Sequence, residues 1–459
     1  MSATTETLTV LEPATEAVLA ELPRPGVEET DAAVARAKAA LPAWRAMPPA
    51  DRARLLHRLA DALEREQEAL AVLEARNAGK PIGDARGEMG MVADTFRYYA
   101  GAPERNLGDT IPVAGGVAMT FREPLGVVGL IVPWNFPLTI AAWKLAPALA
   151  AGNTVVLKPA ELTPLTALRF EQIALETGVP EGVVNVVAGP GRTCGQRLVE
   201  HPDVAKVAFT GSTEVGRGIA AGAAATIKRV TLELGGKSAN IVFADADIER
   251  AAAAALPAVF GNAGQDCCAR SRILVERSAI DDFLSALEPH LHALRVGDPL
   301  DESTEMGPLI SAGQRESVAS FLDDGAPVAM RGTAPDGPGF WFPPTVLAPV
   351  DRGARAAAEE IFGPIACVMP FDGEADAIAA ANDTIYGLSG SVWTRDGARA
   401  LRVARAVETG VMSINSNTSV RVSTPFGGFK QSGVGRELGP HALEHYSELK
   451  SVYYATTEG

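Results

Sequence analysis

Two adjacent cysteines are the residues of this chain best suited to covalent chemistry. They lie in the segment Phe260-Gly-Asn-Ala-Gly-Gln-Asp-Cys-Cys-Ala-Arg-Ser-Arg272, directly after a Gly-Gln turn. A thiol in a turn of small and polar residues is partly accessible and close to backbone N–H donors, which favours a reactive thiolate over a packed thiol. If Cys267 is a nucleophile, the chain should also supply an oxyanion donor, a general base and a cofactor site.

Polar side chains at the ends of three apolar runs could assist such a nucleophile. Asn135 lies in Pro133-Trp-Asn-Phe-Pro137, where two prolines could aim its amide as an oxyanion donor, although a helix cap is the simpler alternative. Glu233 ends another run, where burial would raise its pKa and suit it to general-base work, unless it is only a paired structural carboxylate. Lys158 and Glu161 follow a third run.

Three glycine-rich loops could bind phosphate, but none matches a nucleotide motif. Gly189-Pro-Gly-Arg-Thr-Cys-Gly195 misses the dinucleotide spacing by one residue, and Gly235-Gly-Lys-Ser238 lacks the first glycine of a phosphate loop. Gly211-Ser-Thr-Glu-Val-Gly216 follows an expected strand and opens an expected helix, so that Ser212 and the helix N-terminus could hold a phosphate. Each loop is equally consistent with an ordinary turn.

The elements that must position these residues follow an α/β pattern. Apolar strands alternating with helices are expected at residues 127–132, 154–157, 184–187, 206–209 and 230–234. This alternation is typical of a doubly wound parallel sheet, which binds ligands at the carboxyl ends of its strands. A second α/β unit is expected from residue 236 to about residue 428.

The flanking segments carry further predicted elements. Apolar spacing predicts helices over 29–46 and 51–76. Gly115-Gly116 separates two β-prone arms, which predicts a hairpin over 109–124. A strand is expected at 450–455, where it could pair with the hairpin or with another subunit.

Composition narrows the class of protein. The 459 residues are 47% hydrophobic and 21% charged, as in a soluble globular protein, and the net charge of −15 argues against a nucleic-acid partner. The uncharged run over 124–143 contains Pro133, Asn135 and Pro137, so no membrane span is expected. No secretory signal is visible, which predicts a cytoplasmic location with four reduced cysteines. The chain has no His-Glu-x-x-His or Cys-x-x-Cys motif, so no metal site is expected.

Taken together, these motifs resemble those of the NAD(P)-dependent aldehyde dehydrogenase superfamily, in particular bacterial aminoaldehyde and betaine-aldehyde types. The resemblance extends from Glu12-Pro-Ala-Thr15 to Pro425-Phe-Gly-Gly-Phe-Lys-Gln-Ser-Gly433. It rests above all on one ordered set: Asn135, Lys158, Glu233, Cys267 and Glu360.

The resemblance implies a role for each matched residue. Cys267, as the second residue after Gly-Gln, is the implied nucleophile, and Cys268 is its neighbour. Asn135, with the backbone N–H of Cys267, is the implied oxyanion donor, and Glu233 the implied base that activates water. The residues implied to bind the cofactor are Trp134, Lys158, Glu161, Gly211, Ser212, Glu360 and Phe362. Lys158 is also implied to be catalytic. Glu161 favours NAD over NADP because a carboxylate repels a 2′-phosphate, although NADP stays possible.

The resemblance also implies a fold and an assembly. The implied Rossmann-like NAD-binding domain comprises 1–108 and 125–235, and the α/β catalytic domain comprises 236–430. Oligomerisation elements are implied at 109–124 and 431–459, in a homodimer or a homotetramer.

The substrate is expected to be a small aliphatic or ω-amino aldehyde, oxidised to its acid through a thioester. Apolar and aromatic residues that could form a substrate tunnel are Phe136, Ile140, Trp143 and Phe426. Asp266 could favour a cationic aldehyde, or it could equally point to backbone or solvent. An acylating enzyme that uses coenzyme A and a non-catalytic protein of the same fold are the alternatives. Glu233 argues against the first, and the intact Cys267, Asn135 and Glu233 argue against the second.

Overall fold

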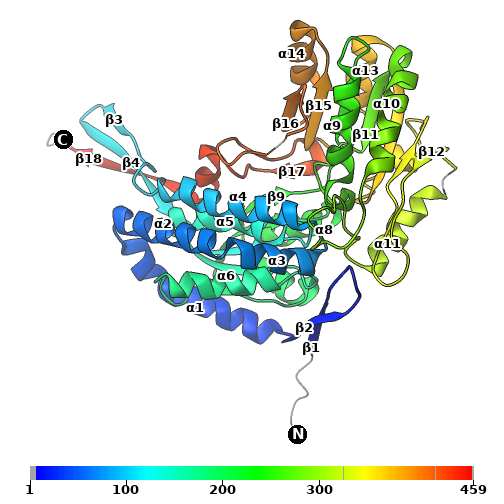
Figure 1. Cartoon of the computed structure of the whole chain (residues 1–459). Coiled ribbons are helices and arrows are strands. Elements are labelled where there is room, and N and C mark those ends of the chain that lie inside the picture. The colour runs from blue at the N-terminus through cyan, green and yellow to red at the C-terminus, as the bar shows by residue number, and fades with distance from the viewer. Residues whose placement is uncertain (1–6, 324, 419, 457–459) are drawn as a thin grey trace.

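Two helix-covered sheets and a projecting three-stranded arm make up the fold (Figure 1). The computed structural model describes residues 7–323, 325–418 and 420–456. The six-stranded sheet has the order β17-β9-β8-β5-β6-β7, and the seven-stranded sheet has the order β12-β13-β14-β11-β10-β15-β16. The predicted α/β class is confirmed.

The six-stranded sheet contains the five predicted strands, which run parallel to one another. They are β5 (Val127–Ile131), β6 (Thr154–Lys158), β7 (Val184–Val186), β8 (Val204–Thr210) and β9 (Arg229–Glu233). The helices between them are α5 (Pro137–Ala150), α6 (Leu165–Glu176), α7 (Gln196–Glu200) and α8 (Thr213–Ala224). An antiparallel edge strand, β17 (Gly433–Val434), comes from the predicted oligomerisation segment 431–459 and pairs with β9.

The uncharged run over 124–143 is divided between β5 and the start of α5, as its prolines indicated. None of the helices described for this chain is both long enough and apolar enough to cross a bilayer.

The N-terminal region differs in part from its prediction. It contains a hairpin of β1 (Thr7–Leu11) and β2 (Val18–Pro23), and four helices: α1 (Val27–Ala46), α2 (Pro49–Arg65), α3 (Gln67–Ala78) and α4 (Ile82–Ala100). The single helix expected over 51–76 is two helices, because the backbone of Glu66 (φ −90°, ψ 3°) ends one and begins the next. Sequence reasoning missed β1, β2 and α4.

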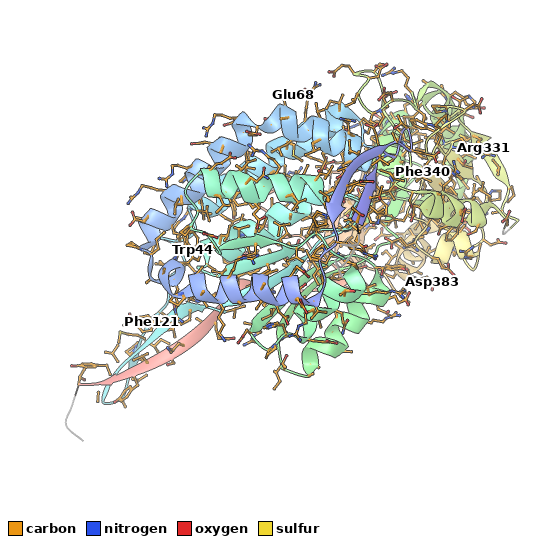
Figure 2. The ribbon with its side chains drawn as sticks, turned by 90° about the horizontal axis from the view of Figure 1, so that it is seen from below. Trp44, Glu68, Phe121, Arg331, Phe340 and Asp383 are labelled. Atoms are coloured by element: carbon orange, nitrogen blue, oxygen red, sulfur yellow. The ribbon has the colours of Figure 1, made fainter. Side chains whose placement is uncertain are left out.

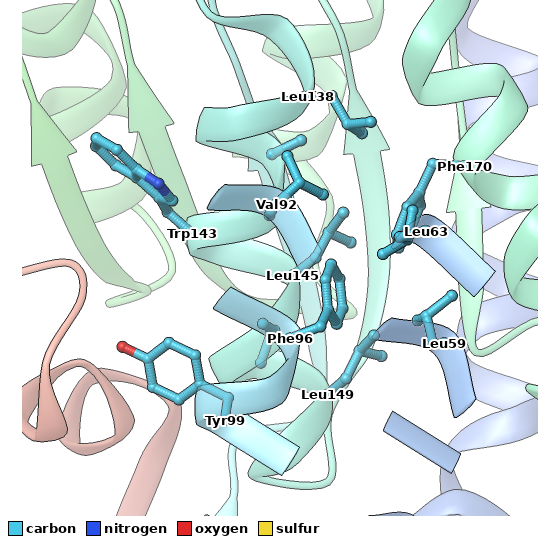
Figure 3. Packing of buried hydrophobic residues seen from close by; sticks show 14 of the residues in the cluster. Leu59, Leu63, Val92, Phe96, Tyr99, Leu138, Trp143, Leu145, Leu149 and Phe170 are labelled. Atoms are coloured by element: carbon cyan, nitrogen blue, oxygen red, sulfur yellow. The ribbon is translucent and has the colours of Figure 1, made fainter. Parts of the chain in front are cut away.

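A buried hydrophobic cluster joins these helices to the six-stranded sheet (Figure 3). Every residue of α5 is buried, and the Phe96 ring of α4 lies 5.4 Å from the Phe170 ring of α6. The α5 helix, which begins two residues after Asn135, is therefore enclosed by packing on all sides.

The seven-stranded sheet forms the second unit. Its strands are β10 (Ala239–Val242), β11 (Arg272–Glu276), β12 (Val328–Arg331), β13 (Thr345–Leu347), β14 (Ile365–Phe371), β15 (Ser389–Trp393) and β16 (Val411–Ile414). Its helices are α9 (Ile248–Phe260), α10 (Ile280–Ala293), α11 (Ala312–Ala319), α12 (Arg355–Ala358), α13 (Gly373–Asn382) and α14 (Gly397–Ala406). The order places β10 and β11, which flank the segment with the two cysteines, in the middle of the sheet.

The predicted hairpin and the C-terminal strand form the arm. β3 (Thr110–Val113) pairs with β4 (Gly116–Pro124), and β18 (Ser447–Ala455) pairs with β4 from Ser447 opposite Pro124 to Ala455 opposite Gly116. The arm extends away from the body, and Phe121 lies on it (Figure 2). The C-terminal strand thus pairs with the hairpin of its own chain.

Candidate active site

Cys267 lies in a tight turn between α9 and β11. Asn262, Ala263 and Gly264 all have positive φ angles, which reverse the chain after α9. A Cβ on Gly264 would lie 2.2 Å from the carbonyl oxygen of Gly363, so only glycine fits there. The buried side chain of Gln265 accepts from the N–H of Ile310 at 2.9 Å and donates to the carbonyl of Asn262 at 3.1 Å. The half-buried Cys267 follows this clamped segment.

Asn135 is hydrogen-bonded to the same turn. Its Nδ2 donates to the carbonyl oxygen of Gln265 at 3.0 Å, and the Nδ2 of Asn262 donates to the Asn135 carbonyl at 3.0 Å. Phe136, rather than Asn135, occupies the N-cap position of α5, and a carboxylate from another helix, Glu74, accepts from the N–H of Leu138 in the first turn at 3.4 Å. Asn135 is therefore no helix cap. Its side-chain amide has two N–H bonds, of which one donates to the turn and the other remains available to a ligand.

Glu233 ends β9 and is 3% exposed. Neither carboxyl oxygen has a hydrogen-bond partner among the residues that the structure describes. Burial raises the pKa of Glu233 well above its usual value, and the neighbouring Glu437 raises it further. The buried Glu437 is itself ion-paired with Lys144. Glu233 is thus not the paired structural carboxylate that the sequence offered as the alternative interpretation. It has the properties of a general base.

The thiol of Cys267 differs from the thiolate that the sequence favoured. A hydrogen bond with Cys268 raises the pKa of Cys267 well above its usual value, and burial and the charges of Asp266 and Glu360 raise it further. The turn alone would favour a thiolate, but it lies among acidic groups from other segments. Cys267 must therefore lose its proton to a base before it can attack a carbonyl carbon.

A cavity of about 280 Å³ opens at the carboxyl ends of β5, β8 and β9. Five residues of the predicted cofactor set line it together with Cys267: Trp134, Gly211, Ser212, Glu360 and Phe362. Ser212 caps α8 by accepting from the N–H of Val215 at 3.3 Å. Gln314, which no motif indicated, also lines the cavity, and its Nε2 donates to the carbonyl of Phe362 at 2.8 Å.

The walls of this cavity suit a dinucleotide. The rings of Trp134 and Phe362 meet edge to face at 5.2 Å. Glu360 accepts from the N–H of Gly236 at 2.8 Å, and burial raises its pKa to about 7. A Cβ on Gly235 would lie 2.3 Å from Oε2 of Glu360, so a glycine keeps this carboxylate in place. The N-terminus of α8 offers a phosphate site next to these groups.

Lys158 and Glu161 lie at the same edge of the sheet but outside this cavity. Lys158 ends β6, and burial lowers its pKa. Glu161 accepts from the N–H of Gly191 at 3.2 Å and lies 3.9 Å from Arg24. The structure therefore does not bring Lys158 to Cys267, and it places both residues by the loop of 189–195.

A second cavity, of about 310 Å³, is also lined by Cys267. Its lining includes Glu233 and the five predicted tunnel residues: Phe136, Ile140, Trp143, Asp266 and Phe426. The rings of Trp143 and Phe426 are 5.3 Å apart at 61°. Cys267 and Thr210 line both cavities, so the thiol lies where the two cavities adjoin.

Besides Glu233, two further carboxylates line the second cavity. Asp266 lines this cavity and also accepts from the N–H of Cys268 at 2.8 Å. It therefore both faces the predicted substrate tunnel and contacts the backbone, the two orientations expected from the sequence. Glu88 of α4, which sequence reasoning missed along with the helix, is ion-paired with Lys80. The Lys80 ammonium lies 4.4 Å from the centre of the Phe136 ring. Burial raises the pKa of Glu88 to about 7.

Comparison with known proteins gives the same family along the whole chain. The model of the aldehyde dehydrogenase family matches residues 1–452. Phenylacetaldehyde dehydrogenase of Pseudomonas fluorescens is 46% identical over 98% of this chain and 93% of its own length. Betaine aldehyde dehydrogenase 1 of Rhizobium meliloti is 46% identical over 96% of this chain and 92% of its own length.

Solved structures are similar in both sequence and fold. PnpE, in complex with nicotinamide adenine dinucleotide, superposes with a TM-score of 0.97 at 45% identity, covering 99% of this chain and 95% of its own. Betaine aldehyde dehydrogenase from Staphylococcus aureus, in complex with NAD⁺, has a TM-score of 0.97 at 38% identity, covering 100% of this chain and 93% of its own.

Proposed function

The chain belongs to the aldehyde dehydrogenase family, and we propose that it oxidises an aldehyde to a carboxylic acid through a thioester on Cys267, with NAD as the acceptor. The observation that carries this proposal is the position of Cys267, which lines both the cavity with the cofactor-type residues and the cavity with Glu233. A thiol in this position can contact a cofactor on one side and an aldehyde on the other.

The residues around Cys267 account for the first half of the reaction. A base removes the thiol proton, and the thiolate attacks the aldehyde carbon. The spare N–H of the Asn135 amide and the backbone N–H of Cys267 stabilise the resulting oxyanion. Because packing holds α5 and the bond to Gln265 holds the amide, this donor needs no reorganisation during the reaction.

Trp134, Ser212, Glu360 and Phe362 are the residues that would hold NAD, and Glu161 would contact its adenosine ribose. When bound, NAD supplies the acceptor for the hydride that the hemithioacetal releases. A carboxylate at Glu161 disfavours the 2′-phosphate of NADP.

Glu233 accounts for the second half of the reaction. As a buried base without a partner among the described residues, it can take a proton from the water that attacks the thioester. Release of the acid restores the thiol of Cys267. The same carboxylate argues against transfer of the acyl group to coenzyme A, because that transfer needs no base for water.

The substrate is proposed to be a small aliphatic or ω-amino aldehyde. Aromatic and aliphatic walls favour an apolar tail, and the carboxylate of Asp266 favours a cationic end, whereas Glu88 is already paired with Lys80. An arylacetaldehyde is the second candidate, because the rings of Trp143 and Phe426 offer an edge-to-face arrangement in which an aromatic tail can pack.

The two substrate candidates are separated by kcat/KM for aldehydes of matched length with cationic, neutral, anionic and phenyl tails. A preference for the cationic tail supports the ω-amino aldehyde, and a preference for the phenyl tail supports the arylacetaldehyde. Equal values for cationic and neutral tails would remove the amino part of the proposal.

The assembly is proposed to be a homodimer or a homotetramer in the cytoplasm. The arm exposes apolar side chains, including Phe121 at 46% and Tyr454 at 65%, and a second copy would cover them. Light scattering on the purified protein measures the mass of the assembly directly. We also propose the division into an NAD-binding domain (1–108 and 125–235), a catalytic domain (236–430) and oligomerisation elements (109–124 and 431–459).

The central experiment compares NADH formation by the wild-type enzyme and by Cys267→Ala with an aldehyde panel. Turnover should disappear in Cys267→Ala and persist in the control Cys367→Ala, whose thiol is buried in β14. Normal turnover by Cys267→Ala would overturn the proposed mechanism.

A further inference from the structure

The turn with the nucleophile also combines three side chains that bind metals. We propose that Asp266, Cys267 and Cys268 form a binding site for zinc, and that zinc bound there inhibits the enzyme reversibly. The inhibition rests on the proposed role of Cys267, whereas the binding does not. The sequence showed neither a Cys-x-x-Cys pair nor a histidine motif, and the site arises instead from three consecutive residues folded into one turn.

The distances among the ligand atoms suit a single small cation. One carboxylate oxygen of Asp266 and the two sulfur atoms of Cys267 and Cys268 all lie within 4.8 Å of one another. Zinc–sulfur bonds of about 2.3 Å in a tetrahedral site place two sulfur atoms about 3.8 Å apart. Small rotations of the side chains therefore bring all three donors to bonding distance.

The turn holds these donors in place without using up their binding capacity. Asp266 accepts from the N–H of Cys268 at 2.8 Å, and its hydrogen bond with the thiol of Cys267 is lost when zinc displaces the thiol proton, so a carboxylate oxygen is then available to the metal. Arg270 donates to the carbonyl of Cys268. Gln265, which precedes Asp266, is held by side-chain hydrogen bonds to the backbone of Asn262 and Ile310. Such support of the ligand-bearing backbone reduces the entropy lost on metal binding.

A second observation concerns the cavity in front of these donors. Glu233 lines the same cavity as Asp266, Cys267 and Cys268, is 3% exposed, and has no hydrogen-bond partner for either oxygen within 7–323, 325–418 and 420–456. A zinc ion with three protein ligands keeps a fourth position for water. Glu233 is placed to accept a hydrogen bond from that water.

Charge also favours a cation at this position. Three carboxyl groups, those of Glu88, Glu233 and Asp266, line the cavity together with one guanidinium group, that of Arg270, so a divalent cation would offset a net negative charge. Two thiolates are soft ligands that favour zinc over magnesium or calcium. On binding, the two S–H bonds break, two zinc–sulfur bonds form, and both protons pass to the buffer without any change of oxidation state. Coordination to zinc lowers the nucleophilicity of the Cys267 sulfur, and the ion occupies the space in front of it, so zinc should compete with the aldehyde.

Binding is tested directly with the full-length enzyme. Titration with Cd²⁺, followed by the ultraviolet absorption of cadmium–thiolate bonds, should show one site per chain, and calorimetry with Zn²⁺ in buffers of different ionisation enthalpy should show release of two protons. Cys268→Ser and Asp266→Asn should bind zinc at least about tenfold more weakly, since loss even of an indirect support weakens metal sites by about 10- to 100-fold. The control Cys367→Ala should bind zinc as the wild type does, and circular dichroism checks that each variant is folded.

Inhibition is tested by NADH formation in chelator-free buffer. Zinc should raise the apparent KM for the aldehyde, EDTA should restore the rate, and the inhibition constant, measured against each variant's own rate, should rise in Cys268→Ser. Unchanged zinc affinity in both Cys268→Ser and Asp266→Asn, or no cadmium–thiolate absorption in the wild type, would overturn the site. A fully active Cys267→Ala would instead overturn the proposed function, and the cadmium absorption of the wild type would still report the metal site.

Discussion

The amide of Asn135 donates from Nδ2 to the backbone carbonyl of Gln265 at 3.0 Å, across 130 residues of sequence. This bond joins the loop after β5 to the turn that carries the nucleophile. It couples the position of the oxyanion donor to the position of the thiol, so that the two cannot move independently.

Asn135→Ala should therefore lower kcat by about 10²- to 10³-fold, as expected for loss of one oxyanion donor, while affinity for NAD changes little. Steady-state kinetics and NAD binding by fluorescence measure the two effects. Asn135→Asp, which keeps the shape but has no N–H to donate, should show a comparable loss. A kcat within about twofold of the wild type in both variants would remove Asn135 from the mechanism.

Glu233→Gln should separate the two halves of the reaction. Acylation does not need water, so a burst of NADH of about one equivalent per site is expected, followed by a much slower steady state. Because the pKa of Glu233 is raised, the steady-state rate of the wild type should increase with pH as this carboxyl loses its proton. The variant should lack that increase. Stopped-flow measurements over a pH series provide both observations.

The same substitution should affect stability in a defined direction. The folded state raises the pKa of Glu233 above its unfolded value, so the folded protein binds the proton more tightly. Stability is then unaffected below the unfolded pKa and declines as pH rises from there toward the folded pKa. Glu233→Gln removes this decline, and its advantage in Tm over the wild type should grow from acidic to neutral pH. Thermal unfolding monitored by circular dichroism at several pH values measures it, and a constant difference would contradict it.

Asp266→Asn tests the charge beside the nucleophile. The negative charge of Asp266 helps to raise the pKa of Cys267, so its removal should shift alkylation of the thiol by iodoacetamide to lower pH. Asparagine can still accept the N–H of Cys268, which preserves the turn. The kcat/KM for a cationic aldehyde should fall by up to about tenfold relative to a neutral aldehyde of equal length, because a partly exposed charge pair contributes about 1 kcal/mol. An unchanged ratio of the two aldehydes would show that Asp266 does not select the substrate.

The site residues that could be predicted from the sequence are those that follow or end apolar strands. The apolar strands that precede Asn135 and Glu233 have strong local patterns, and parallel pairing brings their carboxyl ends to one edge. The helix α4 was not predicted: Gly83, Gly87 and Gly90 lower its helix propensity, and its contribution of Glu88 to the cavity was missed with it.

The raised pKa of Glu233 was predicted from its place at the end of an apolar strand, but other electrostatic properties of the site depend on contacts between distant segments and could not be predicted. The pKa of Cys267 depends in part on Glu360, which lies 93 residues further along the chain. Likewise, the pairing of Glu88 with Lys80 and the isolation of Glu233 follow from packing that no local motif encodes.

The turn before Cys267 provides a test that does not alter any reacting group. Gly264 has a φ of +70°, and a Cβ there would lie 2.2 Å from the Gly363 carbonyl oxygen. Gly264→Ala should therefore destabilise the fold by about 1–3 kcal/mol and displace Cys267, with a loss of kcat larger than the change in KM. Gly261→Ala is the matched control, because Gly261 has a φ of −52° and a Cβ there would meet no neighbouring side chain or backbone atom within 4 Å. Denaturant unfolding and steady-state kinetics on both variants measure the effects. Equal activity of the two variants would show that the geometry of this turn does not position the nucleophile.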